Sequence, residues 1–420
     1  MFEHAETFQG GETSGHLRLG KLEVLYQELF KQVIADGLIT TDERAQLDKM
    51  AASFGLDRER LQRLETALEA AYHAQHRGTE TIAVDIDLSD LSAPEVPPSG
   101  SHDGDELHDR FRAHTAVGDV DRAWCVAQAL AFTNAANPEE RAFFDAHNHA
   151  TLIRPQRPLD RAAWHELLFH PEEDAAIGGI FAVVAPAVLL GRLSALRRDG
   201  QLPALNPAQK HEPVKSTVQA VRCFAWAAAI FGMASPELHV DPDHAGTGEL
   251  VPALPPVVRL GAAALSGRSS EELAFLAGAH LAYFREEHIV SLLVPSLAHL
   301  EEIFLAALRI GKPDLAIPDH VVPIAGAIEP LLDPAALDQL RGQVHRFVEQ
   351  GGRADLRRWV AAVHQTSARA GLLLATDLEA AHNVLALESH RDIDKTTREL
   401  IVFTTSSRYA TLRRHLGITL

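Results

Sequence analysis

The chain of 420 residues contains only two cysteines, Cys125 and Cys223, and both stand in apolar stretches typical of helices. Two thiols cannot form the disulfide framework that stabilises many small secreted proteins, so the cysteine content favours a reducing compartment. The first sixteen residues also lack a basic stretch followed by an apolar run, and we therefore expect no signal peptide. Together these features predict a cytoplasmic protein.

Basic residues are scarce as well, because 39 lysines and arginines stand against 57 acidic residues and give a formal net charge of −18. Nucleic-acid binding needs a basic surface, and anionic membranes attract basic segments, so the charge argues against both partners. The arginine pairs Arg357-Arg358 and Arg413-Arg414 are interpreted as solvated helix faces. We expect an acidic, soluble protein whose partner is another protein or a second copy of itself.

No apolar run is long enough to span a membrane comfortably. The longest stretch without a charge, 175–191, is shorter than the roughly 20 residues that a spanning helix needs. Pro186 interrupts it and Arg192 follows it, so we predict a buried core helix and no membrane span. The sequence also lacks a phosphate-binding loop of the correct spacing and a G-x-S-x-G nucleophile elbow.

Residues 17–76 have the pattern of a small helical bundle, in which leucines and valines recur at helical spacing. The string A-D-G-L-I-T-T-D-E-R, residues 35–44, is followed by a G-L-D turn and resembles the tellurite-resistance TerB-like helical domain. In that family acidic residues are linked to metal binding, and the matching positions here are Asp36 and Glu43. From the residues alone we interpret Asp36 as part of a turn and Glu43 as a charge at a helix N-terminus.

The sequence pattern of the rest of the chain predicts consecutive segments that are mostly helical. Residues 77–104 are acidic and rich in proline, serine and glycine, which predicts a protease-sensitive linker. Residues 105–158 predict a helical hairpin similar to a tetratricopeptide unit, serving as a cap on the domain that follows. Residues 159–420 predict a larger helical domain with a small strand region between about 236 and 262. The expected fold class is mostly α with a small β region.

Within that domain, the segment from Glu272 to Tyr283 reads E-L-A-F-L-A-G-A-H-L-A-Y. It resembles the active-site helix of gluzincin metallopeptidases, the group that includes the CAAX-prenyl endopeptidases and the heat-shock membrane protease. In that group two histidines one helical turn apart hold zinc, and the glutamate after the first histidine is the general base. Here Ala279 and Tyr283 occupy the two histidine positions, and His280 occupies the glutamate position.

A second segment is similar to the stretch that carries the third zinc ligand of gluzincins. It reads T-S-A-R-A-G-L, in which Arg369, Gly371 and Leu372 match the motif. Thr366 stands at the position of the ligand glutamate, and Ala368 at that of an aspartate. The resemblance covers about residues 160–420 and implies a degenerate, gluzincin-like pseudoenzyme that holds no zinc and no other cofactor. It also implies that the two motif helices pack together and that Arg369 is buried and hydrogen-bonded.

Other side chains of metal-binding type form one dense group, made of His239, Asp241, Asp243 and His244. One loop seldom supplies a complete metal site, so we interpret this group as a polar turn. His280 is interpreted as a core histidine, with pairing to His364 or Asp377 as the alternative.

Two functions compete at this stage. The first is a non-catalytic adaptor or assembly component, in which the inactive metallopeptidase-like scaffold mediates protein–protein interaction. The alternative is a metal-dependent hydrolase with a relocated site around His280. The metal content of the purified protein distinguishes them, because a hydrolase of this type needs the Lewis acid that activates water.

Overall fold

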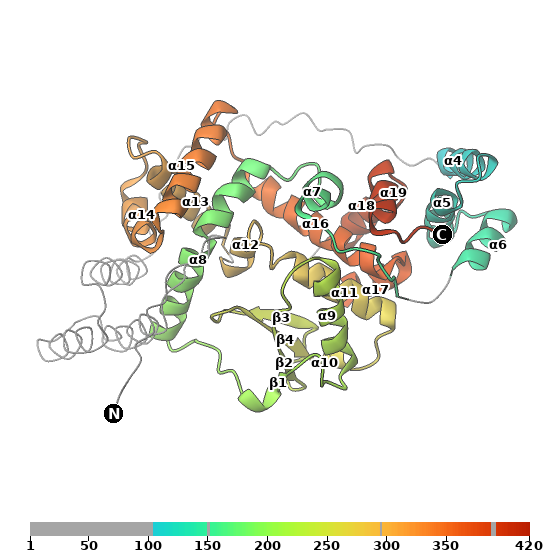
Figure 1. Ribbon diagram of the computed structural model, residues 1–420, viewed down its shortest axis with the longest axis horizontal. Helices are drawn as coiled ribbons and strands as arrows, with labels where there is room; N and C mark the ends of the chain where they lie inside the picture. The colour runs from blue at the N-terminus through green and yellow to red at the C-terminus, as the bar shows by residue number, and fades with distance from the viewer. Residues whose placement is uncertain (1–103, 149–151, 295, 388–391) are drawn as a thin grey trace, which may run out of the picture. The chain divides into compact units, whose positions relative to one another are not determined.

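The computed structural model describes residues 104–148, 152–294, 296–387 and 392–420 (Figure 1). The described residues are mostly helical and include one four-stranded sheet, which confirms the predicted fold class. The predicted TerB-like bundle with Asp36 and Glu43, and the predicted linker up to residue 103, lie outside the described residues.

Contacts along the chain divide the described residues into two units that interleave in sequence. Unit 1 is made of residues 179–201 and 301–353, and unit 2 of residues 104–178, 202–300 and 354–420. The sequence analysis expected consecutive domains with a boundary at 158/159, and this division does not coincide with it. Two of the four crossings, at 178/179 and 300/301, lie inside continuous helices, and the other two, at 201/202 and 353/354, lie between helices.

Unit 1 is a small group of helices. It contains most of α8 (Ala175–Arg198) and α13 (Leu297–Gly311), together with η4 (Asp319–Val321), α14 (Val322–Ile328), η5 (Glu329–Leu331) and α15 (Pro334–Glu349). The Phe304 ring lies 5.6 Å from that of Phe181 and 5.5 Å from that of Phe347, between ring centroids. Gly311 lets α13 approach α15 closely, because a Cβ there would lie 2.5 Å from a methyl carbon of Val344.

Helix α8 is the predicted apolar helix, and it continues through Pro186, which the sequence analysis expected to interrupt it. It is the one helix of the described ranges that is long and apolar enough to cross a membrane. Its most apolar window has a mean hydropathy of 2.0, and 61% of that window is buried within the fold. A core helix of a soluble protein has the same properties, so α8 is weak evidence for a membrane span.

Unit 2 begins with three helices, α4 (Gly104–Ala116), α5 (Val120–Phe132) and α6 (Pro138–His147). The predicted turn and helix entry is present: Gly118 has a φ of +71°, and the Asp119 side chain caps α5 by accepting from the Arg122 N–H. Asn137 and Glu140 form a capping box at the start of α6. The sequence predicted a hairpin of two helices, and the structure adds the third helix, α6.

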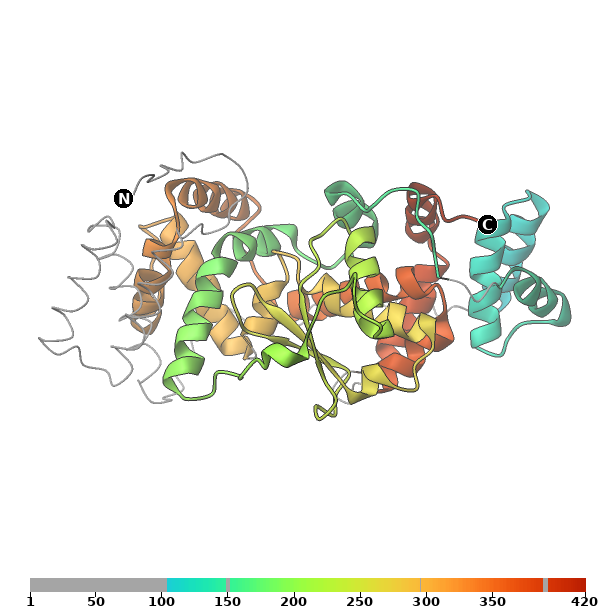
Figure 2. The same ribbon diagram turned by 60° about the horizontal axis from the view of Figure 1, so that its bottom comes forward.

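The strand region predicted between about 236 and 262 is present, and one further strand precedes it in the chain. The strands are β1 (Lys210–His211), β2 (Glu237–Asp241), β3 (Gly248–Val251) and β4 (Val257–Gly261), in the order β1-β2-β4-β3. The central pair β2 and β4 is parallel, with Leu238 opposite Val258, and the two outer strands are antiparallel. Leu238, Val258 and Leu260 are buried in the main core, and α9 (Gln219–Ile230) lies beside the sheet in both views (Figure 2).

The remaining elements of unit 2 are helices around that core. They are α7 (Arg161–Ala163), the π-helix η2 (Trp164–Leu168), the 3-10 helix η3 (Pro207–Gln209), α10 (Ala262–Leu265), α11 (Ser270–Ala282), α12 (Ile289–Leu293), α16 (Leu356–Ala375), α17 (Leu378–Leu387), α18 (Ile393–Thr404) and α19 (Ser407–Leu416). The sequence analysis expected one helix over 394–416. The structure has two, because Ser406 accepts from the Tyr409 N–H and starts a new helix there.

A buried ion pair joins α5 to α19, the last helix of unit 2. The Arg413 guanidinium donates to both carboxylate oxygens of Asp121 at 2.7–3.1 Å and to the Ile418 carbonyl oxygen at 3.1 Å. It also lies 5.0 Å from the centroid of the Trp124 ring. Arg413 is only 2% exposed, so its interpretation as a solvated residue was wrong. The partners are separated by 292 positions, which no local pattern reveals.

We predict that Arg413→Leu destabilises the protein and that Arg414→Leu, the same change at the next residue, does not. Removing Arg413 leaves the Asp121 carboxylate buried without its cation, which costs about 3–5 kcal/mol in comparable pairs. Arg414 is exposed, and such substitutions change stability by about 0.5 kcal/mol or less. Chemical denaturation of both variants measures the difference, and equal midpoints would contradict the structural role of the ion pair.

Candidate functional site

Helix α11 carries the first motif, and its start is defined by a capping box. The Ser269 hydroxyl accepts from the Glu272 N–H at 3.1 Å, and the Glu272 carboxylate accepts from the Ser269 N–H at 3.0 Å. Every residue from Leu273 to Ala279 is buried. The helix is therefore enclosed on nearly all sides.

Helix α16 carries the second motif and packs directly on α11, as the resemblance implied. Two glycines permit this contact. A Cβ at Gly278 of α11 would lie 2.7 Å from the Ala370 carbonyl oxygen, and a Cβ at Gly371 of α16 would lie 2.7 Å from the Phe275 carbonyl oxygen. Backbone therefore approaches backbone at the crossing, where a side chain in place of either glycine would clash.

The positions that correspond to the catalytic residues lie along this pair of helices. Ala279 is 7% exposed and brings no donor atom. The Tyr283 hydroxyl lies 3.1 Å from Nδ1 of His364 on α16. His280 lies beside the outer strand β3, because a Cβ at Gly248 would be 3.3 Å from its Cε1.

Thr366, at the third ligand position, is held in a buried chain of hydrogen bonds. Its hydroxyl accepts from the His170 N–H at 2.8 Å and donates to Oε2 of Glu173 at 2.6 Å. Oε1 of Glu173 lies 2.5 Å from Nε2 of His288, and Nδ1 of His288 lies 3.0 Å from the Ala282 carbonyl oxygen. Thr366 and His288 are fully buried, and the Glu173 side chain is 1% exposed.

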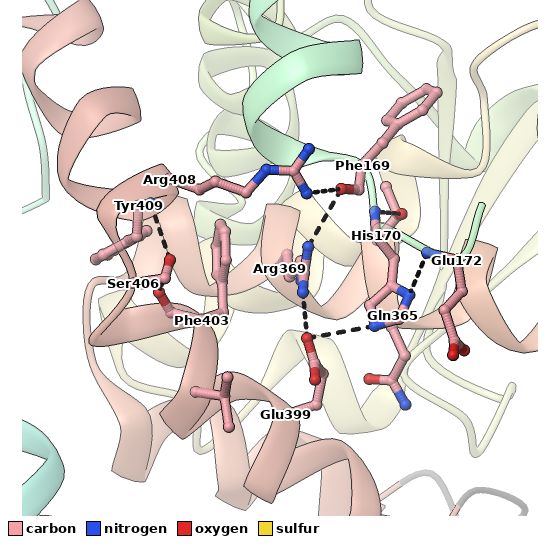
Figure 3. Close-up of polar contacts among 12 residues, drawn as sticks. Phe169, His170, Glu172, Gln365, Arg369, Glu399, Phe403, Ser406, Arg408 and Tyr409 are labelled. Carbon is pink, nitrogen blue, oxygen red and sulfur yellow. Dashed lines mark hydrogen bonds and ion pairs between the residues drawn. The ribbon is translucent and has the colours of Figure 1, made fainter. Parts of the chain in front are cut away.

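Arg369 is 4% exposed and hydrogen-bonded, as the resemblance implied. One nitrogen of its guanidinium donates to the Phe169 carbonyl oxygen at 3.2 Å, and another donates to the Glu399 carboxylate (Figure 3). The guanidinium also lies 4.6 Å from the centroid of the Phe403 ring. Arg369 thereby joins α16 to α18 and to the segment that follows η2.

The charges around Arg369 stay paired despite burial. Burial raises the pKa of Glu399, but hydrogen bonding to His170 and the charge of Arg369 outweigh it and hold the pKa below its ordinary value. Burial lowers the pKa of Arg369, and Glu399 only partly opposes this effect. The guanidinium of Arg408 reaches the same Phe169 carbonyl oxygen at 3.4 Å (Figure 3).

A second buried carboxylate, Glu287, was missed by the sequence analysis. Its Oε1 lies 2.9 Å from a guanidinium nitrogen of Arg285 and 3.2 Å from Nε2 of His165. Burial raises the pKa of Glu287, but His165 and Arg285 outweigh it and hold the pKa well below the usual range. Arg285 in turn lies 4.6 Å above the Trp164 ring. The sequence shows only two adjacent glutamates here, which does not indicate that the second is buried.

The dense group made of His239, Asp241, Asp243 and His244 does not form a metal site among the described residues. Nε2 of His239 is paired with Oε1 of Glu237 at 2.8 Å, and Asp241 accepts from the Asp243 N–H at 3.2 Å. A further hydrogen bond, from the His244 N–H to the Asp241 carbonyl oxygen at 3.1 Å, closes a polar turn. Within the described ranges, no three His, Cys, Asp or Glu side chains are close enough to hold a metal ion together.

No family model matches the chain, and no curated protein or solved structure matches it either. The relationship to gluzincins therefore stays a resemblance, which rests on the two motifs, their order and the packing of the two helices that carry them.

We predict that Gly371→Ala destabilises the protein and that Gly342→Ala, in the exposed interior of α15, does not. The added methyl at 371 would meet the backbone of α11 and force the helices apart, at a cost of about 1–3 kcal/mol. At 342 nothing lies within 4 Å of the new Cβ, and alanine favours a helix over glycine by about 0.5–1 kcal/mol. Denaturation midpoints should move in opposite directions, and a neutral Gly371→Ala would disprove the close contact.

Proposed function

We propose that this protein is a non-catalytic adaptor or assembly component built on a gluzincin-like scaffold. The observation that supports the proposal is the hydrogen bonding of the Thr366 side chain. Its hydroxyl is engaged by His170 on one side and Glu173 on the other, at the position where a metallopeptidase needs a carboxylate ligand. Zinc binds deprotonated nitrogen, sulfur or carboxylate donors, so Thr366 and Ala279 supply none. Without the metal, the scaffold lacks the group that polarises a carbonyl and activates water.

The interaction surface that we favour is the outer edge of the sheet. The strand order places β3 at an edge, and within the described ranges β3 pairs only with β4. An exposed edge strand accepts an extended peptide through backbone hydrogen bonds. Because β3 lies beside His280, a peptide bound there would pass over the degenerate motif. The partner is an extended segment of another protein or of a second copy of this chain.

We extend the proposal to the whole chain. Residues 17–76 would add a TerB-like module, the acidic linker would join it to the scaffold, and the cytoplasm would be the site of action. The large negative charge suits a soluble protein that does not bind nucleic acid.

We predict that the purified protein binds no stoichiometric zinc, whereas a variant with restored ligands does. The variant carries Ala279→His, His280→Glu, Tyr283→His and Thr366→Glu, which together recreate the gluzincin ligand set. Elemental analysis and zinc titration should give about one metal ion per chain, the stoichiometry of such sites. The matched control keeps Thr366 and has the other three changes, so it lacks one ligand and should bind more weakly.

Each outcome of the zinc experiment has a distinct meaning. Stoichiometric zinc in the unmodified protein would overturn the adaptor reading in favour of a hydrolase with a relocated site. A restored variant that folds, as circular dichroism would show, but binds no zinc would overturn the resemblance itself.

We also predict that a photo-crosslinking residue at Leu250 in β3 captures a discrete partner in the native host. The control position is Val117, which is 77% exposed in the turn after α4. A single adduct from position 250 and none from 117 is expected, and mass spectrometry would identify it as a different protein or a second copy. Equal adducts from both positions, or none from either, would count against binding at the β3 edge.

A further inference from the structure

Strand β3 has an edge that no other described strand covers, because it is last in the strand order and pairs only with β4. Just before β3 begins, the Gly261 N–H donates to the Thr247 carbonyl oxygen at 3.1 Å. These two residues are directly opposite, since the register pairs Gly248 with Leu260 at the next position. In an antiparallel ladder, opposite residues that exchange hydrogen bonds alternate with opposite residues that do not. This one bond therefore fixes the hydrogen-bonding phase of the whole strand.

The backbone groups of β3 point alternately toward β4 and toward the open edge. Because the phase starts at Thr247, the residues that hydrogen-bond to β4 are Glu249 and Val251. Gly248 and Leu250 alternate with them and direct their N–H and carbonyl groups outward. An extended segment adds to a sheet edge by pairing with such outward groups. The open edge therefore offers two residues for backbone recognition.

The two faces of the sheet differ in chemistry beside this edge. Leu250 lies opposite Val258, which is buried in the main core, so the Leu250 side chain is on the apolar face. Glu249 is on the other face, because successive side chains of a strand point to opposite faces. A segment added beside β3 would place alternate side chains next to Leu250 on one face and next to Glu249 on the other.

The face that carries Glu249 has an excess of one negative charge at this edge. Nε of Arg259 donates to Oε1 of Glu249 at 2.6 Å, and Nη1 of Arg259 lies 3.7 Å from Oδ2 of Asp241. One guanidinium thus lies between two carboxylates. The Glu249 side chain is 37% exposed, against 23% for Arg259 and 15% for Asp241. A cation on an added strand would reach Glu249 and balance the charge, whereas a carboxylate there would be repelled.

We propose that β3 binds an extended, basic segment of another protein, in which apolar side chains alternate with polar ones and a lysine or arginine lies opposite Glu249. This inference rests on the proposed function and adds the class of partner. The backbone of the segment pairs with Gly248 and Leu250, and its apolar side chains lie beside Leu250. The net charge of −18 also attracts a basic segment from a distance.

Two synthetic peptides test the charge preference on the full-length protein. The first is Thr-Val-Thr-Val-Lys-Val-Thr-Val-Thr, with both ends blocked and a fluorescent label, and the second has glutamate in place of the lysine. Fluorescence anisotropy should show that the lysine peptide binds about fivefold more tightly, the scale of one exposed ion pair. Equal affinity would overturn the charge preference and leave the edge interface in place. Binding of neither peptide would overturn the edge interface of the proposed function as well.

Two substitutions of Glu249 separate a local ion pair from general attraction to an acidic protein. Glu249→Lys should reverse the preference, so that the glutamate peptide binds more tightly. Glu249→Gln keeps the size of the side chain and removes its charge, and it should bind the two peptides about equally; it also keeps the test valid if Glu249→Lys fails to fold. An unchanged preference for the lysine peptide in either variant would overturn the assignment to Glu249.

The outward direction of the Leu250 N–H gives a sharp backbone test. Leu250→Pro removes a donor that β4 does not use, and proline is tolerated at an edge where the N–H faces solvent. This variant should keep its fold, as circular dichroism would show, and lose binding of the lysine peptide. Leu250→Ala loses the side chain but retains the N–H, so it should bind the peptide more tightly than Leu250→Pro. Equal binding by these two variants would overturn backbone pairing at the edge.

Methylation of the peptide backbone repeats this test without changing the protein. Only alternate amides of an added strand face β3. N-methylation of one alternate set should therefore abolish binding, while methylation of the other set should leave it. Equal effects of both sets would overturn strand addition. The crosslinking residue at position 250 identifies the natural occupant, and an adduct between two copies of the chain would overturn the assignment to another protein.

Discussion

The contact between α11 and α16 is the constraint on which the rest of unit 2 depends. Gly278 and Gly371 bring two backbones together, so neither helix can turn or shift without a clash. That fixed crossing places Thr366 beside Glu173 and Tyr283 beside His364. It also directs Arg369 away from α11, toward Glu399 and the Phe169 carbonyl oxygen. The polar groups of the site are therefore positioned by an interface in which two glycines let the helix backbones approach closely.

Sequence patterns predicted the elements whose signals are local. The strand region predicted between about 236 and 262 contains the strands β2 to β4. The pairing of α11 with α16 and the burial of Arg369 came instead from the resemblance, since neither follows from periodicity. The crossing glycines are visible in the sequence, but only the structure shows which backbone each one meets.

Several of the interactions that the sequence did not predict join residues far apart in the chain. Asp121 and Arg413 are 292 positions apart, Glu173 and Thr366 are 193 apart, and Glu173 and His288 are 115 apart. A charged side chain is interpreted as solvated when its partner is unknown, because burying a charge without a partner costs free energy. Because the two units interleave in sequence, residues that are in contact can be far apart in the chain. For the same reason, the sequence read in order does not show the unit boundaries.

Glu173 joins Thr366 and His288 in one buried chain of hydrogen bonds. Its carboxylate comes from a different segment of the chain and lies beside Thr366, the residue that the resemblance aligns with a ligand glutamate. Both oxygens of that carboxylate are already engaged, one by Thr366 and the other by His288. A metal ion could use Glu173 as a ligand only if it displaced one of these partners, and each lies in a site without solvent to receive it. A metal ion and the hydrogen bonds to Thr366 and His288 would thus compete for the same carboxylate.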